Sequence, residues 1–252
     1  MMPDFSVLLQ GPVSWFLFFF CAMLIGMSKT GVQNIGTMTI PLFAMLFGAK
    51  HSTGIVLPML CMADLLAVIY YRKRFHRDLV IKPMPWALMG LVVALIVGDY
   101  VPESNFKIIM GGCVLLGVAT MAGMNNPARV EKISGAIWFA PIIGFVLGFT
   151  TMIGNAAGPI LTVYLFAMRL PKYAFVATGA WFIMILNYMK IPLQILVWDN
   201  VSLTDFMLSL TALPFILLGG LIGIKIVHVL PEKQFKALMV ALTAIATFIL
   251  LF

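Results

Sequence analysis

A succession of about ten apolar runs, separated by short polar stretches, leaves this 252-residue chain few possible folds. Hydrophobic residues make up 62% of the sequence and charged residues only 10%, which is too little polar material to cover a soluble protein of this length. Most runs approach the roughly 20 residues that a helix needs to cross a bilayer. The sequence therefore predicts an all-α polytopic membrane protein with about eight to ten transmembrane segments. The runs cover residues 6–27, 37–48, 52–71, 84–101, 107–123, 135–149, 158–169, 174–196, 206–229 and 236–252.

Two glycine-rich polar breaks interrupt the apolar sequence, GMSKTGVQNIG at residues 26–36 and GFTTMIGNAAG at residues 148–158. The runs 37–48 and 158–169, at or directly after them, are short, because a helix of about 12 residues covers about 18 Å of a hydrocarbon core of about 30 Å. We therefore expect broken or re-entrant half-helices at the breaks. Irregular backbone in lipid is tolerated where protein buries it or where it lines a wet cavity, so the breaks indicate a transporter's binding site. The helix-break glycines are Gly26, Gly31, Gly36, Gly148, Gly154 and Gly158.

The two halves of the chain can be aligned on each other. Gly26, Gly36 and Lys50 match Gly148, Gly158 and Lys172 at an offset of 122, and Pro85, Gly90 and Pro102-Glu103 match Pro214, Gly219 and Pro231-Glu232 at an offset of 129. Each unit holds an odd number of membrane crossings, so the second copy enters the membrane in the opposite orientation. We predict two inverted-topology repeats, residues 1–123 and 135–252, joined by a cytoplasmic linker at 124–134.

The basic residues lie mostly in short loops, where the positive-inside rule explains them better than binding to nucleic acid does. With the loop that contains Arg72, Lys73, Arg74, Arg77 and Lys82 in the cytoplasm, alternation also places Arg129, Lys132, Arg169, Lys172, Lys225, Lys233 and Lys236 inside. Lys50, Lys107 and Lys190 then fall on the outer side, as do both termini. No basic cluster or cleavage site marks a signal peptide, so we expect a multi-pass protein of the cytoplasmic membrane that keeps its first segment.

The polar side chains at the two breaks suit an oxyanion. Half-helix N-termini offer unpaired N–H groups and a partial positive charge, Lys29 adds a full charge, and hydroxyl and amide groups add donors. The candidate substrate-binding residues are Lys29, Thr30, Gln33, Asn34, Thr37, Thr150, Thr151 and Asn155. Two alternatives stay open: the glycines could serve only close helix packing, and Lys29 could extend toward lipid headgroups.

Asp64 lies deep within an apolar run, where an ionisable group is costly enough to suggest a function. It is a candidate for coupling transport to protons, or else it pairs with a basic residue or a helix end. Asn187 occupies almost the equivalent position in the second half. Cys21, Cys61 and Cys113 and the histidines have no metal-ligand spacing, so we expect neither a metal nor a cofactor.

The sequence resembles the TauE/SafE sulfite exporter family over nearly its whole length. The residues that carry the resemblance are GMSKTGVQNIG, the following PLFAMLFGAKHSTGIVLPMLCMADLLAVIYYRKRF, and the second break with its Gly-Asn-Ala-Ala-Gly-Pro sequence. The resemblance implies a permease for small sulfur-containing anions such as sulfite or organosulfonates. The first motif has fewer consecutive glycines here than is usual in the family.

From breaks, repeats and resemblance together we predict a secondary transporter that moves a small anion by alternating access and is not an enzyme. An anion channel would use the same breaks as a filter, and an intramembrane enzyme would need a catalytic group such as Asp64 or Lys29. The expected partners are the anion and the lipid bilayer, and the sequence leaves homo-oligomerisation open.

Overall fold

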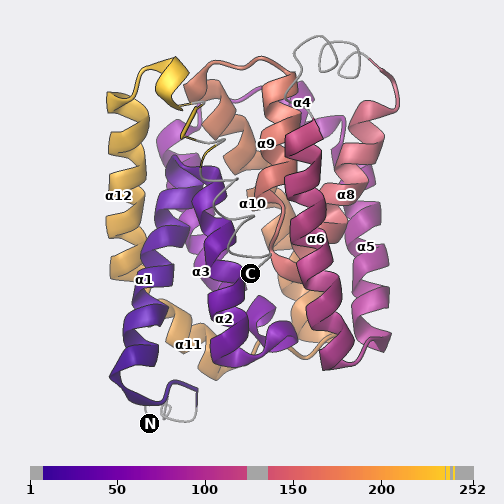
Figure 1. Cartoon of the computed structure of the whole chain (residues 1–252), viewed down its shortest axis with the longest axis vertical. Helices are drawn as coiled ribbons and strands as arrows, with labels where there is room; N and C mark the ends of the chain where they lie inside the picture. Colours follow the sequence, from indigo (N-terminus) through magenta and orange to yellow (C-terminus); the bar gives the residue numbers. More distant parts are fainter. Residues whose placement is uncertain (1–7, 124–135, 236, 239–240, 242–252) are drawn as a thin grey trace.

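The fold is a bundle of helices along one axis (Figure 1), and the computed structural model describes residues 8–123, 136–235, 237–238 and 241. Every regular element in these ranges is helical, which confirms the predicted all-α class. The predicted linker 124–134, with Arg129 and Lys132, and also Lys236 lie outside the described residues. Four segments there are individually long and apolar enough to cross a bilayer: α1 (Gly11–Thr30), α3 (Ala49–Tyr71), Arg77–Tyr100 with α4 (Arg77–Ile81) and α5 (Met84–Tyr100), and α10 (Lys172–Leu196).

The structure describes further helices, and they leave the number of membrane spans undetermined. Two helices bent by 51°, α11 (Leu203–Thr211) and α12 (Leu213–Val229), together qualify as a fifth span. The described residues also include α6 (Glu103–Gly123) and the shorter apolar helices α8 (Phe139–Gly154) and α9 (Gly158–Ala167). The polytopic architecture is therefore confirmed, while the count of eight to ten segments stays a prediction.

Short helices begin at both breaks, as predicted. After α1, the 3₁₀ segment η2 (Gln33–Met38) leads into α2 (Thr39–Phe47), which has nine residues. After α8, Asn155 adopts a left-handed conformation with φ of 55°, and α9 follows with ten residues. Figure 1 shows α2 at the end of the bundle where α1 and α3 begin. After α1, the chain therefore turns back toward that end before it enters α3.

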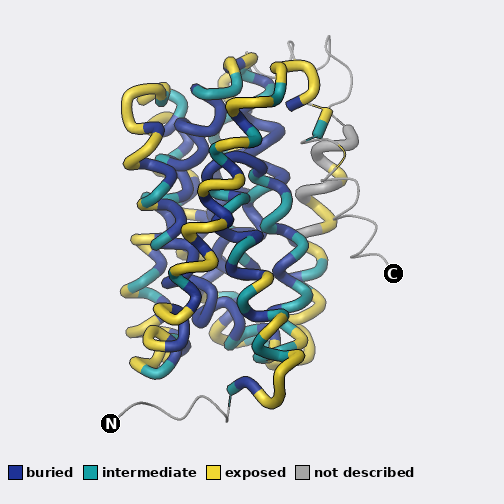
Figure 2. The backbone as a smooth tube through the Cα atoms, turned by 90° about the vertical axis from the view of Figure 1, so that its left-hand side faces the viewer, coloured by how far each residue is buried: buried dark blue, intermediate teal, exposed yellow. Residues whose placement is uncertain are grey.

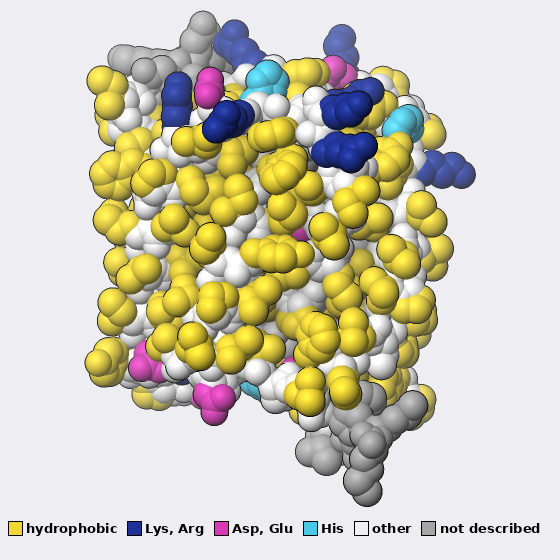
Figure 3. All heavy atoms as spheres, turned by 180° about the vertical axis from the view of Figure 1, so that it is seen from behind, with side chains coloured by type: hydrophobic (Ala, Val, Ile, Leu, Met, Phe, Trp, Pro, Cys, Tyr) yellow, Lys and Arg dark blue, Asp and Glu magenta, His cyan; other side chains and the backbone are white. Residues whose placement is uncertain are grey.

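The outer surface of the bundle is apolar. Large hydrophobic side chains such as Phe16, Tyr100 and Leu221 are exposed, and Figure 2 shows buried residues on the inner faces of the helices and exposed ones on the outer faces and at the ends. In the view of Figure 3, hydrophobic side chains form a broad belt, and Lys and Arg gather at the end that holds α4. An apolar belt of this extent suits lipid rather than water.

Glycines bring four of these helices into close parallel pairs. A methyl group on Gly26 of α1 would lie 2.0 Å from the Ile216 carbonyl oxygen of α12, and one on Gly148 of α8 would lie 1.8 Å from the Ala87 carbonyl oxygen of α5. Such distances leave no room for any side chain, so the backbones touch as in small-residue packing of membrane helices. Each pair joins a helix from the first half of the chain to one from the second.

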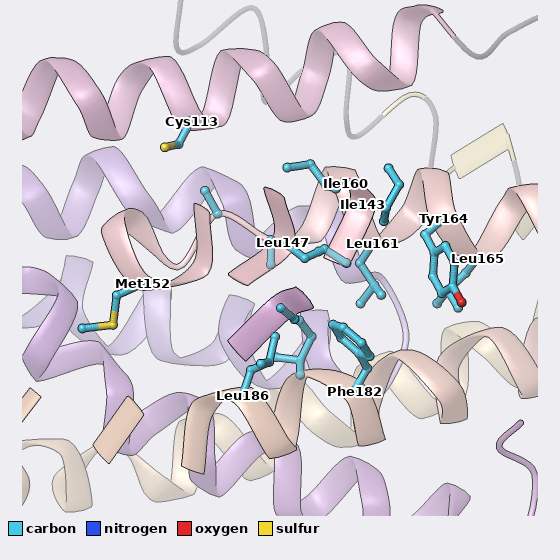
Figure 4. Packing of buried hydrophobic residues seen from close by; sticks show 14 of the residues in the cluster. Cys113, Ile143, Leu147, Met152, Ile160, Leu161, Tyr164, Leu165, Phe182 and Leu186 are labelled. Carbon is cyan, nitrogen blue, oxygen red and sulfur yellow. The ribbon is translucent and has the colours of Figure 1, made fainter. Parts of the chain in front are cut away.

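The largest apolar core packs against α9. Figure 4 shows Leu161 of α9 pointing toward Phe182 and Leu186 of α10, while Ile160 lies on the side of α9 that faces Cys113 of α6. These side chains are buried. The short second half-helix is thus held on two sides by long helices, which fixes the position of the break that precedes it.

Candidate functional site

The two breaks line one cavity, with a volume of about 70 Å³. A cavity of this size has room for roughly five water molecules, or for an anion of a few non-hydrogen atoms. Its walls come from α1, η2, α2, α3, α6, α8, α9 and α10. The polar residues that line it are Ser28, Lys29, Gln33, Thr37, Thr39, Ser52, Thr53, Asp64, Thr151, Asn155 and Asn187.

Five of the eight predicted substrate-binding residues line this cavity: Lys29, Gln33, Thr37, Thr151 and Asn155. They come from both breaks, so the fold brings together side chains that lie more than a hundred residues apart. The Gln33 Oε1 atom is buried and accepts no hydrogen bond from another described residue. It is therefore available as an acceptor beside the cavity.

The other three predicted residues are not among the lining residues, and their recorded side-chain hydrogen bonds go to other groups of the protein. Thr30 donates to the Gly220 carbonyl of α12 at 2.8 Å, and Thr150 donates to the Val146 carbonyl at 2.8 Å. Asn34 is fully buried and accepts a hydrogen bond from Thr162 of α9 at 3.0 Å. Hydroxyl groups in membrane helices often bond to a carbonyl of the preceding turn in this way, which the sequence alone does not distinguish from ligand binding.

The six predicted helix-break glycines divide into two groups. Gly36, Gly154 and Gly158 lie in η2 or at the ends of α8 and α9, and they line the cavity. Gly26 and Gly148 lie inside α1 and α8, so their assignment to the breaks was wrong: they pack against α12 and α5. Gly31 follows the last residue of α1 and also packs on α12, at the Gly223 carbonyl.

The break in the first half of the chain faces the beginning of α9. A methyl group on Gly158 would lie 3.5 Å from Asn34 Oδ1, from the Gln33 carbonyl oxygen and from Thr37 Oγ1. With the bond from Thr162 to Asn34, this contact ties η2 to the second half-helix. The N-terminus of α9 thus opens beside the polar groups of η2, as expected for a shared site.

Lys29 and Asp64 form an ion pair at the cavity wall. Lys29 Nζ lies 2.8 Å from Asp64 Oδ1, and the Asp64 side chain is fully buried while that of Lys29 keeps 15% exposure. Lys29 therefore turns inward and not toward lipid headgroups. The alternative that Asp64 pairs with a basic residue is correct, and it is compatible with a role in transport because the pair borders the cavity.

Lys190, a fully buried lysine that the charge pattern predicts on the outer side, extends this polar cluster. Asn187 of α10 donates to Asp64 Oδ2 at 2.6 Å and accepts a hydrogen bond from Lys190 Nζ at 3.3 Å. Lys190 also donates to Asn155 Oδ1 at the second break. It is fully buried inside α10. Its position three residues after Asn187, within an apolar run, was the available sequence signal, since such residues share a helix face.

The polar cluster continues toward the beginning of α3. Asn155 Nδ2 donates to the Thr53 carbonyl oxygen at 3.4 Å, and Gln194 Nε2 donates to Thr53 Oγ1 at 3.3 Å. Asn200 then donates to the Lys50 carbonyl oxygen at 2.8 Å and to Gln194 Oε1 at 2.9 Å. Thr53, Gln194 and Asn200 were not expected from the sequence. A chain of polar contacts therefore runs from Lys29 through both halves to the first turn of α3.

Other groups that could carry chemistry lie apart from one another. In the described ranges no three His, Cys, Asp or Glu side chains are placed to hold a metal ion. Cys21, Cys61 and Cys113 are free and buried, and Cys21 and Cys113 belong to two different apolar clusters.

A multi-pass helical protein with a polar cavity between two broken helices has the architecture of a membrane transporter. The chain belongs to the sulfite exporter TauE/SafE family, whose model matches residues 10–250, nearly the whole sequence. This match confirms the resemblance found in the sequence. No curated protein and no solved structure matches the chain significantly.

Proposed function

We propose that this protein is a secondary transporter that moves a small anion, sulfite or an organosulfonate, across the cytoplasmic membrane by alternating access. The observation that carries the proposal is the cavity of about 70 Å³ lined by both breaks, with the Lys29 ammonium and the Asn155 amide on its wall. Ammonium, amide and hydroxyl groups donate hydrogen bonds to oxyanions. The match to the sulfite exporter family supports a sulfur-containing substrate.

Alternating access rests on two inverted repeats, and the helix contacts support them. Gly26 meets Ile216 and Gly219 meets Met23, while Gly148 meets Ala87 and Gly90 meets Phe145. Under the sequence offsets of 122 and 129 these two sets of contacts are equivalent. The pair of α1 and α12 and the pair of α5 and α8 could each move as a unit against the rest of the bundle. Such a movement would expose the cavity to one side of the membrane and then to the other.

Asp64 is the residue we propose for coupling to protons. It is the one acidic side chain among the described residues that line the cavity. A carboxylate there repels an incoming anion and holds Lys29 by its charge. Protonation would remove the repulsion and release Lys29 at the same time, so that binding of the anion and of a proton would favour each other.

Flux into proteoliposomes tests the proposal. The purified protein is reconstituted, and uptake of radiolabelled sulfite, sulfoacetate, taurine and simple carboxylates is measured with and without a pH gradient. We expect saturable uptake of sulfite or a sulfonate that responds to the gradient, and no such response with Asp64→Asn. Uptake of carboxylates alone would contradict the substrate class, and the absence of uptake by folded protein would contradict transport.

A further inference from the structure

Lys190 is a buried lysine that pairs with no acidic side chain of the described residues. Its side chain is fully buried, and in the part of the chain that the structure describes no carboxylate oxygen lies within 4.0 Å of its Nζ atom. Its two hydrogen-bond partners are the neutral amide oxygens of Asn155 and Asn187. An ammonium group in a membrane-spanning helix is costly unless an opposite charge compensates it, so its presence indicates a function.

The partners of Lys190 connect it to the cavity. Asn155 and Asn187 both line the cavity, and Lys190 lies directly behind them. The other lysine of the cluster, the partly exposed Lys29, already has Asp64 at 2.8 Å. With both amines protonated and Asp64 ionised, the cluster holds two positive charges and one negative charge. The excess of one positive charge is located at Lys190.

We propose that Lys190 supplies the counter-charge for the transported anion, and that the site therefore takes a single negative charge when Asp64 is ionised. This inference rests on the proposed function and names both a further binding residue and the charge class of the substrate. A monoanion in the cavity would make the cluster neutral, whereas a dianion would leave an uncompensated negative charge in a low-dielectric environment. The oxyanion would displace an amide oxygen of Asn155 or Asn187 from the Lys190 ammonium.

A single isosteric substitution can turn Asn155 from a neutral hydrogen-bond acceptor of Lys190 into a negatively charged one. Asn155→Asp places a carboxylate where the amide oxygen now accepts from Lys190, so the protein itself would supply the missing counter-charge. Aspartate also tolerates the left-handed backbone at this position. The variant should fold at least as well as the wild type and should lose anion binding, because the charge that attracts the anion is already compensated.

Binding of a charge-matched pair of ligands tests the proposal. Sulfoacetate carries two negative charges at neutral pH, and its amide, sulfoacetamide, carries one with nearly the same shape. Affinities are measured by calorimetry on purified protein, with an unfolding temperature for each variant to verify folding. Wild-type protein should bind sulfoacetamide more tightly, and Lys190→Met and Asn155→Asp should each weaken that binding by about thirtyfold or more. Lys107→Met, the same change at an exposed position of α6, should have no effect.

The Asp64→Asn variant should show the opposite ligand preference to the wild type. Asp64→Asn leaves two unpaired cations in the cluster, so its preference should shift toward sulfoacetate. Folded Lys190→Met and Asn155→Asp proteins that bind sulfoacetamide as the wild type does would overturn the role of Lys190 while leaving transport intact. Wild-type protein that binds neither of these compounds nor sulfite would instead overturn the proposed function.

Discussion

At the scale of single residues, the ion pair between Lys29 and Asp64 should contribute to folding as well as to transport. Lys29→Met leaves a buried carboxylate with Asn187 as its remaining polar partner, which should cost about 3 kcal/mol of stability. Asp64→Asn should cost less, because the partly exposed Lys29 side chain can reach water. The double variant should be more stable than the sum of the two losses predicts.

Thermal unfolding of the four proteins in detergent measures this coupling. Ser104→Cys, a change at an exposed position at the beginning of α6, serves as a control for the effect of substitution itself. Strictly additive losses would mean that Lys29 and Asp64 do not interact in the folded protein.

At the residue level, the sequence draws attention to a polar side chain that stands out against apolar neighbours. Asp64 and Lys29 were recognised in this way, and their contact at 2.8 Å follows the expectation of a partner. Lys190 was missed because alternating topology assigned it to the outer side. Thr30 and Thr150 each donate to a helix carbonyl, and a hydroxyl that does so has the same sequence appearance as one that faces a cavity.

At the scale of helices, the glycines at which two helices touch predict the effect of substitution by alanine, and a glycine of α6 without such a contact serves as the control. Gly26→Ala and Gly148→Ala each place a methyl group 2.0 Å or less from a backbone oxygen of the neighbouring helix, so α1 and α12, or α8 and α5, would have to separate. Both variants should lose most of their folded yield. Gly112→Ala in α6 meets nothing within 4 Å and should be neutral or slightly stabilising.

Fluorescence-detected size exclusion of tagged variants compares these yields directly. Similar losses for Gly26→Ala and Gly148→Ala would also agree with equivalent positions in two repeats. Folded yields equal to that of Gly112→Ala would contradict the close helix contacts.

The helices themselves were largely predictable from hydropathy and glycine content. The short runs after both breaks become α2 and α9, close to their expected positions. The function of each glycine was not predictable, because a glycine that opens a break and one that lets two helices touch are identical in sequence. Only the neighbour across the interface distinguishes them, and that neighbour comes from the other half of the chain.

At the scale of the whole molecule, charge distribution predicts the orientation in the membrane. Lys73 lies between α3 and α4 in the chain, and Ser104 lies in the first turn of α6. Figure 1 shows α4 at one end of the bundle and the beginning of α6 at the other. We expect Lys73 on the cytoplasmic side. A membrane-impermeant maleimide should label Lys73→Cys only in inside-out vesicles and Ser104→Cys only in intact cells. The native cysteines are buried and should give little background.

The opposite labelling pattern would reverse the proposed orientation, and labelling of both positions from one side would contradict the topology. Neither result would affect the cavity itself, because its walls are defined by contacts inside the bundle.

Counterflow in proteoliposomes tests the central claim, alternating access to one anion site, most directly. Vesicles loaded with unlabelled sulfite are diluted into a trace of labelled sulfite, with the membrane potential clamped to zero. A carrier predicts transient accumulation of label above the external concentration, because outward movement of unlabelled anion returns the site to the outer face. Equilibration without an overshoot would indicate a channel and would contradict alternating access.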